Sequence, residues 1–271
     1  ENVCWNIRHC NLDPDKNKFL TLLTAKFCAL FSNFIPSRII CNSHAGKRTH
    51  CNFGYVPEKL HVIPNGFDVH EFFPNSKIRK QVRESLRIEE DRFVFGSVGR
   101  YDPQKNHHDL FRSFALVVQR FPKALLICCG KDISFDNPEI IDQIQSLNLS
   151  ENVLCLGLRK DVSQVLNAFD VFVSSSLGEG FSNAIGEAMA VRIPCVVTDV
   201  GDSGKLIGST GWVVEPNCHV KLAQAMMLAV QASSDELEKR GRQARSRVGE
   251  TFSIEAIISL FEQLYKKLIS R

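Results

Sequence analysis

The second half of this sequence alternates short apolar runs with stretches of helical periodicity, and this alternation limits the possible folds more than any other feature. The apolar runs are strand-length and lie at 93–98, 124–129, 153–156, 171–174 and 194–198. Each is apolar along its whole length, which is typical of strands buried on both faces. Helical patterns separate them at 110–121, 138–147, 162–169 and 182–190. The alternation predicts a doubly wound α/β domain with a parallel sheet.

The loops that follow the apolar runs are where a ligand site is expected. In parallel α/β sheets, ligands bind in the crevice outside the carboxyl ends of the strands. Three further helical patterns come after the last apolar run, at 220–231, 236–248 and 254–269.

Residues 1–74 have a different pattern and predict a separate unit. Strand candidates lie at 3–7, 38–41 and 60–63, and a helix candidate lies at 16–31. Three strands are too few for a doubly wound sheet, and the segment at 72–76 has the character of a linker. We therefore interpret 1–74 as the C-terminal part of a Rossmann-like domain whose beginning is absent. Residues 75–250 then form the ligand-binding domain, and 251–271 form a terminal helix.

Composition excludes several other classes of protein. The net charge of +3 is too small to indicate nucleic-acid binding, and no apolar stretch is long enough to span a membrane. The ten cysteines are scattered without a C-x-x-C pair, which favours reduced thiols in a cytoplasmic protein over disulfides. Neighbouring His107 and His108 point apart on a helix, so we expect no metal site there.

Two cations lie in the loop after the first apolar run, at Arg100 and Lys105. A diphosphate needs converging cations, and arginine offers a fork to phosphate oxygens while lysine offers a mobile point charge. Gly99 is expected to let the backbone turn closely. Most loop cations are merely solvated, so this loop alone does not establish a phosphate site.

The segment GEGFSNAIGEAMA follows the fourth apolar run and opens a helix. Either Ser182 or Asn183 is a suitable N-cap, and the free amides of a first helical turn attract anions. Gly180 is expected to allow close approach of the backbone to a ligand.

Two carboxylates of this segment can face one pocket, Glu179 from the loop and Glu187 from the helix, where Glu187 shares a face with Asn183. Carboxylates suit ribose and sugar hydroxyls. The alternative is a loop glutamate and an exposed helical glutamate without a shared role.

Two other loops are less specific. The small-residue loop at 199–204 either closes over a nucleotide or is an ordinary turn. Asn65-Gly66, inside the segment PNGFD, predicts a tight turn with a structural role.

Together these motifs resemble the retaining glycosyltransferases of family 4 (group 1), which have the two-domain GT-B fold. The most specific element is the E-x7-E motif from Glu179 to Glu187. The G-R-x-x-x-x-K motif of Arg100 and Lys105 and the PNGFD segment support it in the right order. The resemblance covers nearly the whole chain, although the family's first domain contains several more strands.

The resemblance implies a role for each motif residue. Arg100 and Lys105, with Gly99 beside them, would hold the donor diphosphate and stabilise charge on the leaving group. Glu187 would bind the ribose and Glu179 the transferred sugar. The backbone amides expected to assist are those of Gly180, Phe181, Ser182 and Asn183.

Two further residues receive expected roles. Arg159 lies in the segment 157–161, which is expected to choose the base of the donor. His9 lies near a functional histidine of the acceptor domain in relatives, while an ordinary strand-end histidine is the alternative. The resemblance implies no metal and no other cofactor.

The predicted function is retaining transfer of a hexose-type sugar from a nucleoside-diphosphate sugar to a glycan or lipid-linked acceptor, in the cytoplasm. The alternative is a truncated nucleotide-sugar-binding module without turnover. In relatives the last helix crosses back onto the first domain. Basic residues near the end predict either peripheral membrane contact or a solvated face, and they are Lys239, Arg240, Arg242, Arg245, Arg247, Lys266, Lys267 and Arg271.

Overall fold

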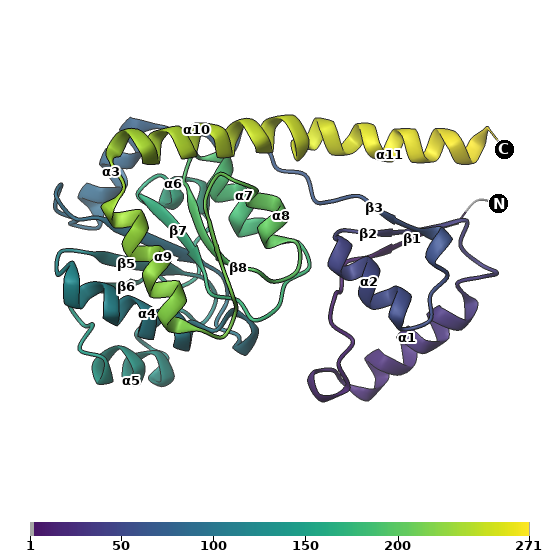
Figure 1. Cartoon of the computed structure of the whole chain (residues 1–271), viewed down its shortest axis with the longest axis horizontal. Helices are drawn as coiled ribbons and strands as arrows, with labels where there is room; N and C mark the ends of the chain where they lie inside the picture. The colour runs from purple at the N-terminus through teal and green to yellow at the C-terminus, as the bar shows by residue number, and fades with distance from the viewer. Residues whose placement is uncertain (1–2, 271) are drawn as a thin grey trace.

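The computed structural model describes residues 3–270, which form two α/β units side by side, with two consecutive helices running across the top of both (Figure 1). The smaller unit has three parallel strands in sequence order, β1 (Cys4–Ile7), β2 (Arg38–Cys41) and β3 (Leu60–Val62). Its helices are α1 (Phe19–Phe31) and α2 (His44–Asn52), with short 3-10 turns η1 (Pro14–Lys16) and η2 (Pro57–Lys59).

The larger unit contains six parallel strands in the order β6-β5-β4-β7-β8-β9. They are β4 (Val94–Val98), β5 (Leu125–Cys129), β6 (Val153–Cys155), β7 (Val171–Ser174), β8 (Cys195–Thr198) and β9 (Trp212–Val214). The chain runs outward from β4 to β6, then returns to β7 and runs outward the other way. The strand order therefore reverses between β4 and β7, which is where doubly wound sheets bind ligands.

Helices cover both faces of the larger sheet, as the all-apolar strands predicted. Adjacent residues of one strand enter different cores: Val94 packs in the cluster around α7, while Phe95 packs in the cluster around α4 and α9. The helices are α3 (Ser76–Ser85), α4 (His107–Arg120), α5 (Pro138–Ser146), α6 (Val162–Leu166), α7 (Asn183–Ala190), α8 (Ser203–Ile207), α9 (His219–Gln231) and α10 (Ser234–Thr251). The expected doubly wound parallel sheet is confirmed.

Some elements differ from the sequence-based expectation. The helix expected at 16–31 begins only at Phe19, because Asp13 and Pro14 start a separate 3-10 turn. The expectation also lacked α2, α3, α8 and β9. Both α2 and α3 are rich in polar residues, whereas α8 and β9 are too short to show a period.

The last helix, α11 (Ile254–Ile269), crosses from the larger unit to the smaller sheet. On the sheet face that Ile40 occupies, it packs Ile257 against Ile40 and Ile63. Alternate residues Ile39 and Cys41 face the opposite side, toward α1 and α2. The smaller sheet is thus covered on both faces within one chain.

The segment between the units is held at the joint between α10 and α11. The Phe67 amide donates to the Phe252 carbonyl at 2.8 Å, and the Ile254 amide donates to the Phe67 carbonyl at 3.1 Å. The prediction of a tight turn at Asn65-Gly66 is wrong, because the backbone forms no turn over residues 63–66. The glycine serves packing instead: a Cβ on Gly66 would lie 3.0 Å from the Ile254 Cα.

Candidate active site

The loop after β4 is folded by its own acidic residue. Asp102 caps the 3-10 turn η3 (Pro103–Lys105) by accepting from the Gln104 amide at 2.9 Å. Its carboxylate also accepts from the Arg100 guanidinium at 2.8 Å. This cap holds Arg100 and Lys105 on the same loop at the carboxyl end of the central strand.

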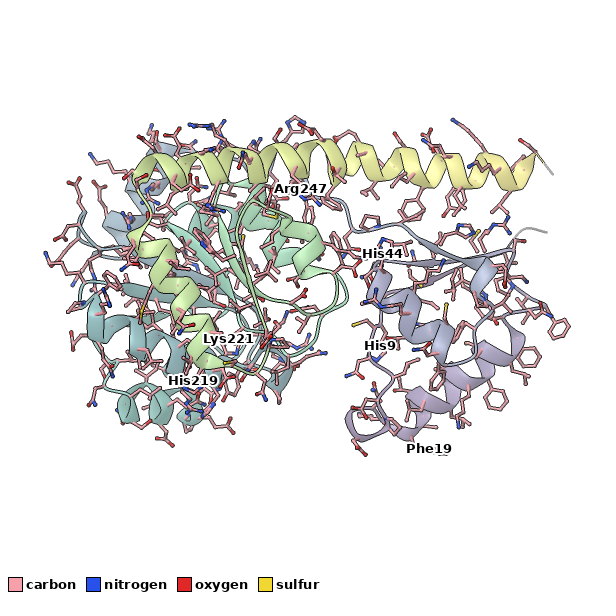
Figure 2. All side chains as sticks on the ribbon, viewed as in Figure 1. His9, Phe19, His44, His219, Lys221 and Arg247 are labelled. Atoms are coloured by element: carbon pink, nitrogen blue, oxygen red, sulfur yellow. The ribbon has the colours of Figure 1, made fainter. Side chains whose placement is uncertain are left out.

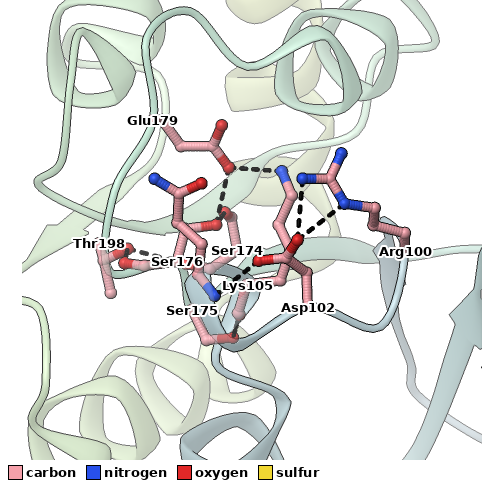
Figure 3. Close-up of polar contacts among 9 residues, drawn as sticks. Arg100, Asp102, Lys105, Ser174, Ser175, Ser176, Glu179 and Thr198 are labelled. Atoms are coloured by element: carbon pink, nitrogen blue, oxygen red, sulfur yellow. Dashed lines mark hydrogen bonds and ion pairs between the residues drawn. The ribbon is translucent and has the colours of Figure 1, made fainter. Parts of the chain in front are cut away.

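The ammonium of Lys105 forms an ion pair with Glu179, with Nζ and Oε1 2.6 Å apart (Figure 3). The Ser176 hydroxyl donates to the same carboxylate oxygen at 2.8 Å. The side chains of Lys105 and Glu179 are only 26% and 11% exposed. Residues 74 positions apart in the sequence therefore meet at the switch point, in a partly desolvated pair.

Hydrogen bonds to backbone carbonyls tie the β4 loop to the β7 loop beneath this pair (Figure 3). The Ser175 hydroxyl donates to the carbonyls of Lys105 and Asn106 at 2.8 and 3.1 Å. The Leu177 amide donates to the Gln104 carbonyl at 2.8 Å. These bonds set the distance between the two loops before any ligand binds.

Close backbone packing in this region depends on Gly130 rather than on Gly99. A Cβ on Gly99 would meet the Lys105 side chain at 3.6 Å, which is an ordinary contact. At Gly130, φ is +155° and a Cβ would lie 1.9 Å from the Gly99 carbonyl oxygen. The expectation that Gly99 itself is needed for a close turn is therefore wrong.

The N-terminus of α7 presents free amides beside the pair. The amides of residues 180–183 donate no hydrogen bond within the part of the chain that the structure describes. Ser182 occupies the N-cap position, but its buried side chain makes no capping bond. Asn183 accepts from the Asn65 side chain at 2.8 Å, so neither expected side chain caps the helix. An anion at this terminus would find unused donors.

The Phe181 side chain is part of the core. It is buried and lies 6.0 Å from the Phe67 ring and 5.6 Å from the Phe252 ring. The side chain therefore serves the core, and the expected contribution of Phe181 to ligand binding is that of its backbone amide.

Glu187 stands apart from the ion pair. No hydrogen bond or ion pair reaches its carboxylate from the described residues. Burial, and then the charge of Glu71, raises the pKa of the Glu187 carboxyl. The structure thus pairs Lys105 with Glu179, places Arg100 beside them on the loop of Lys105 (Figure 3), and leaves Glu187 outside these contacts.

Arg159 follows β6, the edge strand, at the same carboxyl end of the sheet. Its guanidinium forks onto Asp161 at 2.8 and 2.6 Å, and the side chain is exposed. It makes no contact with the Lys105 and Glu179 pair, from which β5 and β4 separate its strand.

His9 follows β1 and lies on the side of the smaller unit that faces the larger one (Figure 2). Its Nε2 is 3.0 Å from the Asn17 side-chain oxygen, and the ring is exposed. The neighbouring Cys10 is the residue that reaches the site: a Cβ on Gly180 would lie 3.5 Å from its sulfur. Burial, and then the Glu179 charge, raises the pKa of the Cys10 thiol.

The loop at 199–204 joins the two units. Asp202 accepts from the amides of His44 and Ala45 at 2.6 and 3.0 Å, at the N-terminus of α2. Gly201 has a φ of +61°, and a Cβ there would lie 2.1 Å from the Glu179 carbonyl oxygen. The loop is therefore neither a free lid nor an ordinary turn, since it braces Glu179 and binds the opposite unit.

The sequence reasoning missed Cys10, Ser176 and the contacts of Asp202. Cys10 and Asp202 contact segments distant in the sequence, and for Asp202 the separation is 158 residues. The partner of Ser176 is only three residues away, but no local pattern indicates that its hydroxyl bonds Glu179. A polar cavity of about 220 Å³ lies between the units beside α7, lined by residues that include Asn6, Arg8, Asn42, Asn65 and Asn183.

The histidine pair and the cysteines do not form a cluster. His107 is buried, which lowers its pKa to about 4, while His108 is exposed. Within residues 3–270, no three histidine, cysteine or acidic side chains gather as metal ligands, and all ten cysteines are free thiols.

The basic run of α10 is occupied by partners inside the molecule. Arg245 donates to the carbonyls of Phe72, Val69 and Ala190, and Arg247 donates to those of Lys205 and Leu206. The other pairs within the helices are Arg240 with Glu236, Arg242 with Glu238, and Lys266 with Glu262. The run is thus largely structural rather than a free basic face; Arg271 lies outside the described residues.

Comparison with known sequences identifies similar proteins. The profile described as glycosyl transferases group 1 matches residues 92–231. An Escherichia coli protein named UDP-Gal:alpha-D-GlcNAc-diphosphoundecaprenol alpha-1,3-galactosyltransferase is 28% identical over 253 residues, covering 91% of this chain and 64% of that protein. The Staphylococcus aureus capsular polysaccharide biosynthesis glycosyltransferase CapM is 29% identical over 256 residues, covering 90% and 63%. The chain thus spans less than two thirds of these relatives.

Solved structures share the fold over essentially the whole chain. HepE of Anabaena, crystallised with UDP-glucose, has a TM-score of 0.86 at 24% identity, covering 100% of this chain and 72% of HepE. Sucrose-phosphate synthase of Thermosynechococcus elongatus has a TM-score of 0.84 at 23% identity, covering 98% and 68%. The arrangement of the two α/β units is therefore that of the GT-B fold.

Proposed function

Because the chain belongs to the group 1 glycosyltransferases, we propose that it serves retaining transfer of a hexose-type sugar from a nucleoside-diphosphate sugar. The acceptor in this proposal is a glycan or a lipid-linked glycan. The observation that carries it is the Lys105 and Glu179 ion pair beside the unused amides of α7, at the reversal of strand order.

The proposed chemistry uses the pair as a preformed exchange site. A donor diphosphate attracts Lys105 and Arg100, and the departing ammonium leaves Glu179 free to accept from sugar hydroxyls. As the bond from the anomeric carbon to the diphosphate breaks, negative charge grows on the diphosphate. The acceptor hydroxyl bonds to the same face of that carbon and passes its proton to the departing phosphate oxygen. The two cations and the amides of residues 180–183 stabilise that charge, so no metal or other cofactor is required in this scheme.

Uracil is the first donor base to test. The E. coli relative is named for UDP-galactose, and HepE was crystallised with UDP-glucose. We therefore propose a UDP-sugar as the donor of the present chain. Gly99, Arg159 and Glu187 are assigned to the nucleotide side of the site. His9 is assigned to the acceptor side.

The acceptor and the compartment are extended from the same relatives. The E. coli relative is named for a diphosphoundecaprenol-linked substrate, which favours an acceptor held at a membrane. No helix within residues 3–270 has both the length and the apolarity to cross a bilayer. Ten free thiols fit the reducing cytoplasm, where we place the activity, without a nucleic-acid partner.

Two measurements test the proposal: calorimetry with UDP, and release of UDP from UDP-glucose or UDP-galactose in the presence of GlcNAc-diphosphoundecaprenol, the acceptor for which the E. coli relative is named. Lys105→Ala should weaken UDP binding about tenfold or more and lower release about 100-fold, because the diphosphate loses a charge-assisted bond. Glu179→Gln should bind UDP nearly normally but lose release. Proton NMR of the glycosylated acceptor should show that the transferred sugar keeps the α configuration that it has in the donor.

Lys123→Ala is the matched control, since Lys123 also pairs with an acid, Asp91, but is exposed and precedes β5 at the opposite edge of the sheet. Lys123→Ala should leave both UDP binding and UDP release unchanged. Undiminished UDP binding by Lys105→Ala would contradict the assignment. Wild-type binding without release would favour the second candidate, a nucleotide-sugar-binding module, which the partial coverage of the relatives keeps open.

A further inference from the structure

One carboxylate of the larger unit binds the smaller unit directly. Asp202 follows β8, is only 4% exposed, and accepts from the amides of His44 and Ala45 at 2.6 and 3.0 Å. These amides begin α2, and the positive end of a helix suits a negative partner. Figure 2 places His44 on the side of the smaller unit that faces the larger one. Asp202 therefore holds α2 against the larger unit.

The same loop holds the backbone that carries Glu179. The Asp202 amide donates to the Gly180 carbonyl at 3.1 Å. A Cβ on Gly201 would lie 2.1 Å from the Glu179 carbonyl oxygen, so the two segments are in direct backbone contact. Residues 201 and 202 thus connect the segment of Glu179 and Gly180 to α2 of the opposite unit.

Helix α2 in turn holds two residues of the smaller unit that face Gly180. Asn42 lies between β2 and α2, two positions before His44. The Thr49 hydroxyl of α2 donates to the Cys10 carbonyl at 3.0 Å. The Asn42 side-chain oxygen and the Cys10 sulfur would lie 3.4 and 3.5 Å from a Cβ on Gly180. Cys10 and Asn42 form a wall against the start of α7, which we call the Cys10–Asn42 wall.

We propose that Asp202 is a positioning residue for sugar transfer, which holds the Cys10–Asn42 wall against Gly180 while the acceptor reacts. The proposal rests on the proposed function, in which the neighbouring Glu179 binds the transferred sugar. With the wall in place, the anomeric carbon is screened from bulk water and the acceptor hydroxyl is aligned with it. Asp202 itself contacts neither substrate.

Water and the acceptor hydroxyl compete for the same carbon. In both reactions the bond from the anomeric carbon to the diphosphate breaks and UDP leaves. The new bond goes to the oxygen of the acceptor hydroxyl or of water, and the proton of that group passes to the departing phosphate oxygen. Moving the wall away slows transfer and leaves hydrolysis equal or faster. The ratio of hydrolysis to transfer therefore reports the wall, and it does not depend on the fraction of a variant that is folded.

Free sugar and glycosylated acceptor, both measured with UDP-glucose or UDP-galactose and GlcNAc-diphosphoundecaprenol, give this ratio. Asp202→Ala should raise the ratio at least tenfold while the affinity for UDP stays within twofold of the wild type. Asp202→Asn should raise it less, because the amide oxygen still accepts from α2. Thr49→Val should raise it severalfold but add little to Asp202→Ala, because both changes act on the same wall.

Lys205→Ala is the matched control. Lys205 also carries a charge and lies three positions after Asp202, but its side chain is exposed on α8. The ratio of hydrolysis to transfer in Lys205→Ala should equal that of the wild type. Equal ratios in the wild type and Asp202→Ala would overturn the proposal, and so would an equal rise in Lys205→Ala.

A measurement without turnover separates this proposal from the proposed function. The rate at which iodoacetamide labels Cys10, followed by mass spectrometry, reports how closely the wall lies against Gly180. Asp202→Ala and Asp202→Asn remove the same charge, so labelling at least threefold faster in Asp202→Ala than in Asp202→Asn supports the positioning role. Equal labelling in the two variants contradicts it. A wild type that neither transfers nor hydrolyses the donor would contradict the proposed function, and the labelling result would still decide whether Asp202 holds the wall.

Discussion

Single residues of the site differ in how strongly their surroundings constrain them. Lys105 and Glu179 are paired within a partly buried site and share Ser176 and the β7 loop as supports. Arg100 pairs with Asp102 on the same loop, but its side chain is 62% exposed, so water screens that pair. We therefore expect Lys105 and Glu179 to be positioned before a donor binds, and Arg100 to adjust to it.

His107 gives the chain a pH dependence at its own position. Burial, and then the charge of Lys105, lowers its pKa to about 4 from 6.5. The unfolded state gains a proton below pH 6.5, whereas the folded state resists it, so stability is present above pH 6.5 and lost as pH falls toward 4. This loss should reach about 3 kcal/mol at pH 4.

Urea denaturation at pH 7.5, 5.5 and 4 measures this effect. His107→Phe keeps a ring between Tyr101 and Phe111 and should flatten the pH dependence. The exposed His108→Gln should not. If the free energy of unfolding falls equally with pH in the wild type and in His107→Phe, another group causes the loss of stability in acid.

At the scale of elements, α10 is a polar helix that is held by what its arginines bind. It buries only Gly241, Ala244 and Val248. Arg245 replaces the missing apolar contact by donating to three carbonyls of the segment after β3 and of α7. Its position also sets where α11 begins, and so where the terminal helix meets the smaller sheet.

Arg245→Ala should lower the free energy of unfolding by roughly 2 kcal/mol or more, because three carbonyls lose a charged donor. Arg242→Ala is the matched change on the same helix and removes only an exposed pair with Glu238. It should cost about 0.5 kcal/mol or less. Urea denaturation of both variants tests the difference, and equal losses would argue against the carbonyl contacts.

Across the whole molecule, the carboxyl ends of the two sheets face each other. Loops after β1 and β2 supply Cys10 and Asn42, which lie against Gly180. The loop after β8 supplies Asp202, which accepts from the first two amides of α2 in the opposite unit. The negative carboxylate suits the positive end of that helix and holds the two units in this relative position.

Asp202→Ala should let the units separate, because the amides of His44 and Ala45 then lose their acceptor across the interface. Small-angle X-ray scattering should show a larger radius of gyration, and UDP binding should persist because Lys105 and the α7 amides remain. Asp142→Ala, an exposed change on α5, should alter neither. An unchanged radius of gyration in Asp202→Ala would mean that α11 alone fixes the arrangement.

Much of the site follows from local sequence and sheet topology. All-apolar strands required a sheet covered on both faces, and a parallel sheet places every loop after a strand at one edge. Arg100, Lys105 and Glu179 lie in two such loops, and their meeting could be anticipated. The family motifs were recognised from the same residues.

The sequence by itself thus determined the parallel sheet and the edge at which its polar loops gather, because strand burial and helix periodicity are local patterns. Only the tertiary structure decided that Phe181 points into the core, that Glu187 stays outside the ion pair, and that Asp202 binds the opposite unit. Those outcomes depend on which distant segments pack together. A local sequence pattern does not indicate a contact between residues more than a hundred positions apart, such as the contact of His44 with Asp202.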